Sequence, residues 1–155
     1  MWRSLLLVLM VFPASSMAQR SDVPETLVGS WYSASNYPQP VEAVGHSFNR
    51  IRSVVTRESN GEYVQIAYLY LDGKKVADFT RRGRWGSGDG RIWHSCETVK
   101  INDQSLNCST VARQEAVILE LSANTFRYRD DTAGSTIKGM MATAVRVPKN
   151  FQLQP

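Results

Sequence analysis

RSVVTRESNGEYVQIAYLYLDGKKVADFTRRGRW, residues 52–85, is the stretch that decides the fold. It contains three runs rich in β-branched and aromatic residues, 52–59, 62–71 and 74–85, separated by Asn60-Gly61 and Asp72-Gly73. Both dipeptides favour the two-residue turns that join antiparallel strands, because Asn, Asp and Gly tolerate a positive φ. We therefore predict a three-stranded antiparallel meander in the middle of the chain.

Two-residue turns would fix how these three strands face one another. The first turn sets Arg57 opposite Val64, and the second sets Arg81 beside Val64 on its other side. Directly opposed residues share a face of the sheet. One surface is therefore expected to be apolar and inside, lined by Ile51, Val55, Val64, Ile66, Tyr68, Tyr70, Ala77 and Phe79. The opposite surface is mostly polar, as in a sheet with one face in water.

The rest of the chain also has the composition of strands. Further strand-like runs follow, with turn residues between them, at 91–101, 105–112, 116–121, 125–130 and 136–147. We expect loops at 38–42 and 86–90 and a single helical turn within 23–28. In the late hairpin, Leu121 should face Phe126 and Leu119 should face Tyr128. Short strands at this spacing predict an all-β sandwich or barrel.

The first 18 residues have the pattern of a secretory signal peptide. Arg3 precedes an apolar run over 4–12, and Ser16 and Ala18 are placed for cleavage. The apolar run is shorter than the roughly 20 residues that a membrane-spanning helix needs. We expect a cleaved signal over 1–18, with an uncleaved anchor as the alternative. One domain over 19–155 would then be periplasmic or secreted.

Cys96 and Cys108 are the only cysteines of the chain. Export would place them in an oxidising compartment, and the turn-like run Asn102-Asp103-Gln104 lies midway between them. We predict a cross-strand disulfide, which would stabilise the fold by about 3 kcal/mol in the chain-entropy model. A metal site that uses His94 and Cys96 is the alternative, but its ligand set would be incomplete.

Charge and histidine content indicate neither a nucleic-acid partner nor a particular reaction. The formal net charge is +4, and the densest basic run is Arg81-Arg82-Gly83-Arg84. That run is either a solvated strand end or an anion-binding patch, without the interleaved aromatic residues of a nucleic-acid surface. His46 and His94 are the only histidines and lie in no recognisable catalytic or metal-binding arrangement. We predict no cofactor and no metal, and find little support for catalysis.

Several short motifs together resemble the small bacterial lipocalin-like domains of the calycin superfamily. These motifs are Gly29-Ser30-Trp31, Gly83-Arg84-Trp85, the stretches 90–93 and 118–126, and a closing strand that ends in Ala144-Val145-Arg146-Val147. The resemblance implies an antiparallel up-and-down barrel of about eight strands. It also implies structural roles for Gly29 and Trp31, with Trp31 plugging one end of the barrel and Arg146 stacked on its ring.

The same resemblance implies a small apolar or amphipathic ligand inside the barrel. Arg57 and Arg81 share the predicted inner face, so they lie either at a solvated rim or around an anion, since buried guanidinium groups need partners. In the second case they would bind a carboxylate whose apolar tail packs on Ile66, Tyr68, Phe79 and Tyr128. The alternative is a filled barrel that binds another protein through the segments 37–44 and 86–90.

Overall fold

The computed structural model describes residues 24–43, 45–110 and 113–155. The predicted signal peptide over 1–18 lies outside the described residues. In chain order the elements are η1 (Glu25–Leu27), β1 (Gly29–Ala43), β2 (His46–Arg57), β3 (Glu62–Leu71), β4 (Lys74–Gly88), β5 (Arg91–His94), β6 (Thr98–Ile101), β7 (Gln104–Leu106), η2 (Cys108–Thr110), β8 (Gln114–Leu121), β9 (Thr125–Asp130) and β10 (Met141–Val147).

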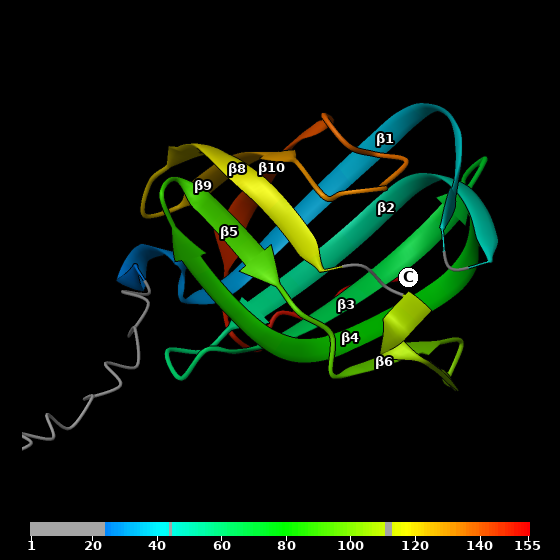
Figure 1. Cartoon of the computed structure of the whole chain (residues 1–155). Helices are drawn as coiled ribbons and strands as arrows, with labels where there is room; N and C mark the ends of the chain where they lie inside the picture. Colours follow the sequence, from blue (N-terminus) through cyan, green and yellow to red (C-terminus); the bar gives the residue numbers. More distant parts are fainter. Residues whose placement is uncertain (1–23, 44, 111–112) are drawn as a thin grey trace, which may run out of the picture.

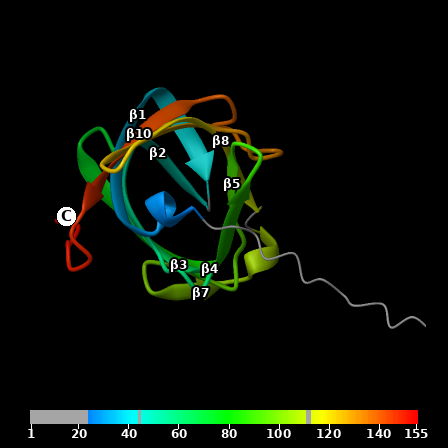
Figure 2. The same ribbon diagram turned by 90° about the vertical axis from the view of Figure 1, so that its left-hand side faces the viewer.

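Eight of these strands close into an antiparallel barrel (Figure 1). The order around the barrel is β3-β2-β1-β10-β9-β8-β5-β4, and β4 closes it by pairing with β3. Seen along its axis, the barrel is a ring of strands, and the short helix η1 lies across one end (Figure 2). The prediction of an all-β barrel is confirmed, as is the single helical turn within 23–28.

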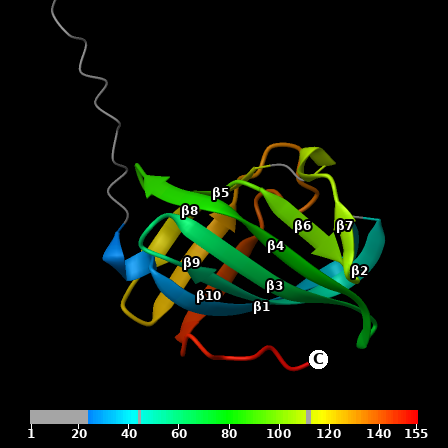
Figure 3. The same ribbon diagram turned by 90° about the horizontal axis from the view of Figure 1, so that it is seen from below.

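A small hairpin of β6 and β7 continues the sheet from β4, along the same edge of β4 as β5 (Figure 3). The predicted strand 91–101 is interrupted at residues 95–97, and β4 pairs first with β6 and then with β5. Asn102 and Asp103 form the hairpin turn with φ of 47° and 64°. Cys96 and Cys108 form a disulfide between the two ends of this hairpin, with an S–S distance of 2.04 Å.

The two Gly-containing turns of the meander behave differently. Asp72-Gly73 forms the predicted two-residue turn, with positive φ at both residues. Asn60-Gly61 belongs instead to a three-residue loop, in which Gly61 alone has a positive φ and its N–H donates to the Glu58 carbonyl. This is the type I turn followed by a left-handed glycine that three-residue hairpins use.

The longer loop shifts the pairing of β2 and β3 by one residue. Arg57 faces Tyr63 rather than Val64. A one-residue shift turns a whole strand over, so the predicted inner face of β3 is wrong: Ile66 is 43% exposed, and Tyr63 and Ala67 are buried. A second irregularity beside Leu69 restores the register in β4. The inner face of β4, with Ala77, Phe79 and Arg81, is therefore the predicted one.

Smaller corrections concern the strand ends and the late hairpin. Leu121 faces Phe126 as predicted, but a bulge places Ile118 rather than Leu119 opposite Tyr128. The expected loop 38–42 is part of β1, and most of 86–90 continues β4. Conversely, 131–140 is a loop although a strand was predicted from 136, and β7 covers only part of 105–112.

The interior holds two apolar clusters. The closed-end cluster consists of Leu27, Trp31, Tyr63, Trp85, Ile92, Ala116, Phe126 and Ala144. The far-end cluster consists of Tyr37, Phe48, Leu69, Ala77 and Ile101. Among the described residues, no helix is long and apolar enough to span a membrane.

The C-terminal segment runs along the outside of the barrel (Figure 3). Arg52 on β2 donates to the Gln154 carbonyl at 3.0 Å, and the Phe151 ring lies 5.8 Å from that of Tyr32 on β1. Leu153 is buried. This extended tail, rather than a helix, covers the outer face at that place.

Candidate functional site

The closed end of the barrel is built around Trp31. Its ring is 1% exposed, and its Nε1–H donates to the Leu27 carbonyl at 3.1 Å. The Arg146 guanidinium lies over the ring, with Cζ 4.4 Å from the centroid, which is the contact that the lipocalin resemblance implies. Such a cation–π contact adds to the stability of the plug.

Each of the three guanidinium nitrogens of Arg146 also donates to a backbone carbonyl. It donates to Thr26 at 2.7 Å, to Val28 at 2.8 Å and to Ala123. Gly29 has a φ of +112°, and a Cβ there would lie 2.6 Å from Arg146 Nη1. A side chain at position 29 would therefore displace the guanidinium, so Gly29, Trp31 and Arg146 form one structural unit.

A cavity of about 150 Å³ lies between the two apolar clusters, since members of both line it. An apolar cavity of about this volume holds a benzene-sized molecule, whereas sites for drug-sized ligands occupy roughly 300 Å³ or more. The wall is also strongly polar, with contributions from Ser33, Ser53, Arg57, Gln65, His94, Gln114, Tyr128 and Asp130. The long apolar tail considered in the sequence analysis does not fit this space.

Arg57 is the charged group at the inner end of the cavity. It is 4% exposed, and its Nε–H donates to His94 Nε2 at 3.0 Å. Its Cζ lies 5.6 Å and 5.8 Å from the ring centroids of Phe126 and Trp85. Its Nη1 is buried and has no hydrogen-bond partner among the described residues. Burial lowers the pKa of Arg57 to about 10, so the group stays cationic at neutral pH.

His94 is neutral because of this environment. Burial, and then the charges of Arg57 and Arg81, lower its pKa well below 6.5. Because Nε2 accepts from Arg57, the ring proton is on Nδ1. The alternative of a metal site with His94 and Cys96 is wrong, since Cys96 is bonded to Cys108.

Arg81 is a second buried arginine, and it hydrogen-bonds to the backbone of His94. It is fully buried, and its Nη2 donates to the His94 carbonyl at 3.3 Å. Burial lowers its pKa, and the neighbouring Tyr63 hydroxyl opposes that shift. With Arg57 and Arg81 both buried, the solvated-rim interpretation is wrong. Nor does the run 81–84 form one basic patch, because Arg82 and Arg84 are exposed on the other side of the strand.

Only part of the predicted ligand-binding set lines the cavity. Arg57 and Tyr128 do so. Arg81 and Phe79 are not among the lining residues. Ile66 and Tyr68 lie outside the barrel, where Lys75 Nζ sits 4.7 Å from the Tyr68 ring centroid. The inverted face of β3 explains these errors, and the correct register would have put Gln65 inside.

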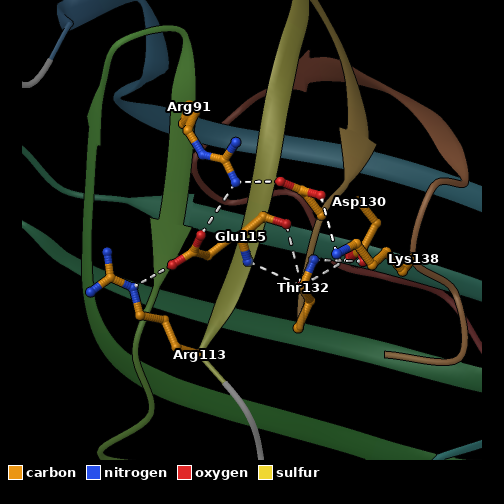
Figure 4. Close-up of polar contacts among 7 residues, drawn as sticks. Arg91, Arg113, Glu115, Asp130, Thr132 and Lys138 are labelled. Carbon is orange, nitrogen blue, oxygen red and sulfur yellow. Dashed lines mark hydrogen bonds and ion pairs between the residues drawn. The ribbon is translucent and has the colours of Figure 1, made fainter. Parts of the chain in front are cut away.

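Acidic and basic side chains form a network beside the cavity (Figure 4). Arg91 contacts both Glu115 and Asp131, and Arg113 Nε lies 3.2 Å from Glu115. Lys138 Nζ lies 3.6 Å from Asp131. Asp130 is different, because its carboxylate accepts from the backbone N–H and hydroxyl of Thr132 and forms no ion pair among the described residues.

Comparisons with known proteins do not assign this chain to a family. No family model matches the chain, and no curated protein matches it. Among solved structures, a redesigned β-barrel matches with 10% identity over 79% of this chain and 92% of that chain, with a TM-score of 0.37. So distant a likeness carries no argument. The chain is an antiparallel eight-stranded barrel, consistent with the calycin architecture.

Proposed function

We propose that this protein is an exported, lipocalin-like binding protein that holds one small organic anion inside the barrel. The observation that carries the proposal is Arg57, a buried cation on the cavity wall whose Nη1 has no hydrogen-bond partner among the described residues. A buried charge without a partner is costly. A carboxylate against Arg57 would offset that cost with a charge-assisted hydrogen bond.

The size and polarity of the cavity restrict the anion to a short one. Its volume of about 150 Å³ suits roughly six to eight non-hydrogen atoms. Ser53, Gln65 and Tyr128 surround this space with further hydrogen-bonding groups. A short-chain carboxylate therefore replaces the long amphipathic ligand suggested by the sequence.

Export is supported by the Cys96–Cys108 disulfide. Disulfides persist in oxidising compartments and are rare in the cytosol. A periplasmic or secreted location is therefore part of the proposal, together with the signal pattern over 1–18.

Isothermal titration of the protein with pentanoate tests this function. We expect binding to the wild type and at least tenfold weaker binding to Arg57→Gln, because a hydrogen bond to a charged group contributes about 1.5–3 kcal/mol. Arg82→Gln is the matched control, since Arg82 is exposed outside the barrel, and its affinity should equal that of the wild type. Equal affinity in Arg57→Gln, or no binding of pentanoate, would contradict the proposal.

A protein-binding role is the second candidate, favoured by the small size of the cavity and by the added hairpin. In the described part of the chain, β7 pairs only with β6, and an edge strand of this kind can accept a partner strand. The contact surface would then be this hairpin rather than the segments 37–44 and 86–90, which are largely within strands. Failure of pentanoate to bind would favour this role.

A further inference from the structure

Asp130 is a second charged side chain that faces the cavity. On β9, the alternating residues Phe126, Tyr128 and Asp130 all line it. Asp130 pairs across the sheet with Ala116, a buried residue that also lines the cavity. The adjacent Glu115 also lines the cavity, but its carboxylate is paired with Arg91 and Arg113. Of these two carboxylates, Asp130 is the one that forms no ion pair among the described residues, so it is available to a ligand inside the barrel.

The nearby cations are engaged with other carboxylates. Lys138 lies beside Asp131, and Arg91 bridges Asp131 and Glu115. Asp130 receives only the two hydrogen bonds from Thr132, at 3.1 and 3.2 Å. Burial, and to a smaller extent the charge of Asp131, raises the pKa of Asp130, whereas the Thr132 hydrogen bonds and the more distant charge of Lys138 lower it. A cation against this carboxylate would therefore gain a charged partner without displacing an existing ion pair.

Arg57 and Asp130 lie at different depths of the same cavity. The Arg57 guanidinium packs against the Phe126 ring. Asp130 is four residues beyond Phe126 on β9, so the Cα atoms of Phe126 and Asp130 are about 13 Å apart. Tyr128 lies between them on the strand, and the charges of both Arg57 and Asp130 affect its pKa. The cavity therefore has a positive inner pole and a negative outer pole.

We infer that the ligand is a short ω-aminocarboxylate, with its carboxylate on Arg57 and its ammonium group on Asp130. This inference rests on the proposed function and makes it more specific. An unbranched chain of about five carbons has roughly eight non-hydrogen atoms, which matches the volume of the cavity. Both buried or half-buried charges would then be neutralised by one molecule.

Four related compounds separate the two poles. 5-Aminopentanoate carries both charges at opposite ends, pentanoate and pentylamine carry one each, and 2-aminopentanoate is an isomer with both charges at one end. In titration calorimetry we expect 5-aminopentanoate to bind at least tenfold more tightly than pentanoate. 2-Aminopentanoate should bind at least tenfold more weakly than its isomer, and pentylamine more weakly than pentanoate.

Asp130→Asn tests the outer pole with an almost isosteric change. Its affinity for 5-aminopentanoate should fall to that of pentanoate, while pentanoate should bind no more weakly than to the wild type. Asp131→Asn is the control, because Asp131 points to Arg91 and Lys138 outside the cavity, and it should keep the wild-type preference. Circular dichroism melting of each variant shows whether it is folded.

The outcomes separate this inference from the broader proposal. If pentanoate and 5-aminopentanoate bind the wild type equally, or if Asp130→Asn keeps the preference, the ω-aminocarboxylate is excluded and anion binding at Arg57 stands. If none of the carboxylates binds, the proposed function fails and the inference fails with it.

Discussion

Two arginines packed on tryptophan rings mark the closed end and the cavity of this barrel, and they differ in how fully they are hydrogen-bonded. Arg146 stacks on Trp31 and donates to three backbone carbonyls. Arg57 lies near Trp85 and donates from Nε to His94, whereas its buried Nη1 has no partner among the described residues. The first arrangement is complete within the protein, and the second leaves hydrogen-bonding capacity for a ligand.

This difference separates a structural role from a binding role better than the residue type does. A satisfied cation contributes to stability, so its removal should destabilise the fold. A buried cation with incomplete partners costs stability, so its replacement by an apolar residue should be tolerated. Substitution of Arg146 should therefore lower the unfolding free energy, whereas substitution of Arg57 by an apolar residue should change it little.

Trp31→Ala should have the largest effect. The side chain is almost fully buried in the closed-end cluster, and truncating a buried Trp costs about 3–5 kcal/mol. Urea unfolding followed by circular dichroism measures this loss. A loss below about 1 kcal/mol would show that the closed end does not hold the barrel together.

Arg146→Met should cost about 2 kcal/mol, because charged hydrogen bonds to three carbonyls are lost while the packing on Trp31 is partly kept. The same urea unfolding measures it. Arg127→Met is a suitable control, since in the described part of the chain Arg127 forms a single, exposed ion pair, with Glu120, and such pairs contribute at most about 1 kcal/mol.

His94 should make the cavity region sensitive to acid. Its folded-state pKa is lowered well below 6.5, first by burial and then by Arg57 and Arg81. Below pH 6.5 the unfolded chain binds the proton and the folded chain does not, so stability falls as pH falls, by up to about 1.4 kcal/mol per pH unit. The window extends from 6.5 down to the folded-state pKa.

His94→Gln should remove this part of the acid sensitivity, because the amide oxygen can still accept from Arg57 and does not titrate. His46→Gln serves as the comparison. Between pH 7 and pH 5 the unfolding free energy should fall by the same amount for the wild type and His46→Gln, and by less for His94→Gln. The same decline in all three proteins would contradict the assignment.

Arg57→Met should have the smallest effect on stability. Replacing this buried, incompletely paired guanidinium by an apolar side chain of similar length removes a buried charge but also the hydrogen bond to His94 Nε2, so the unfolding free energy should change by less than about 1 kcal/mol. Pentanoate binding should be lost in the same variant. A loss of more than 2 kcal/mol on urea unfolding would assign Arg57 a structural role like that of Arg146.

The sequence was sufficient for the class of fold but not for the full register. Asp72-Gly73 formed the predicted turn, whereas Asn60-Gly61 did not. In the second case the Asn60 side chain accepts from the Glu62 N–H and donates to the Glu62 carboxylate, at 2.9 and 3.0 Å. These local hydrogen bonds accompany the three-residue loop, and a dipeptide rule does not include them.

Part of the candidate site, like part of the register, could be predicted from the sequence. Arg57 lies inside as predicted, because the β2 face does not depend on the turn that follows it. The inner face of β4, with Arg81, was also right, since two one-residue shifts cancel between β2 and β4. Gln65 was not predicted to line the cavity, because the predicted face of β3 was inverted. Asp130 forms no ion pair among the described residues because the nearby cations pair with Glu115 on β8 and with Asp131 in the loop 131–140. That arrangement depends on tertiary contacts and could not be predicted from the sequence.

Nuclear magnetic resonance of the arginine side chains tests the difference between the two arginines most directly. The protein would be labelled with ¹⁵N-arginine and titrated with pentanoate while the Nε–H resonances of Arg57 and Arg146 are followed. We predict a saturable shift at Arg57 and none at Arg146. An unchanged Arg57 resonance, or equal shifts at both arginines, would contradict the account.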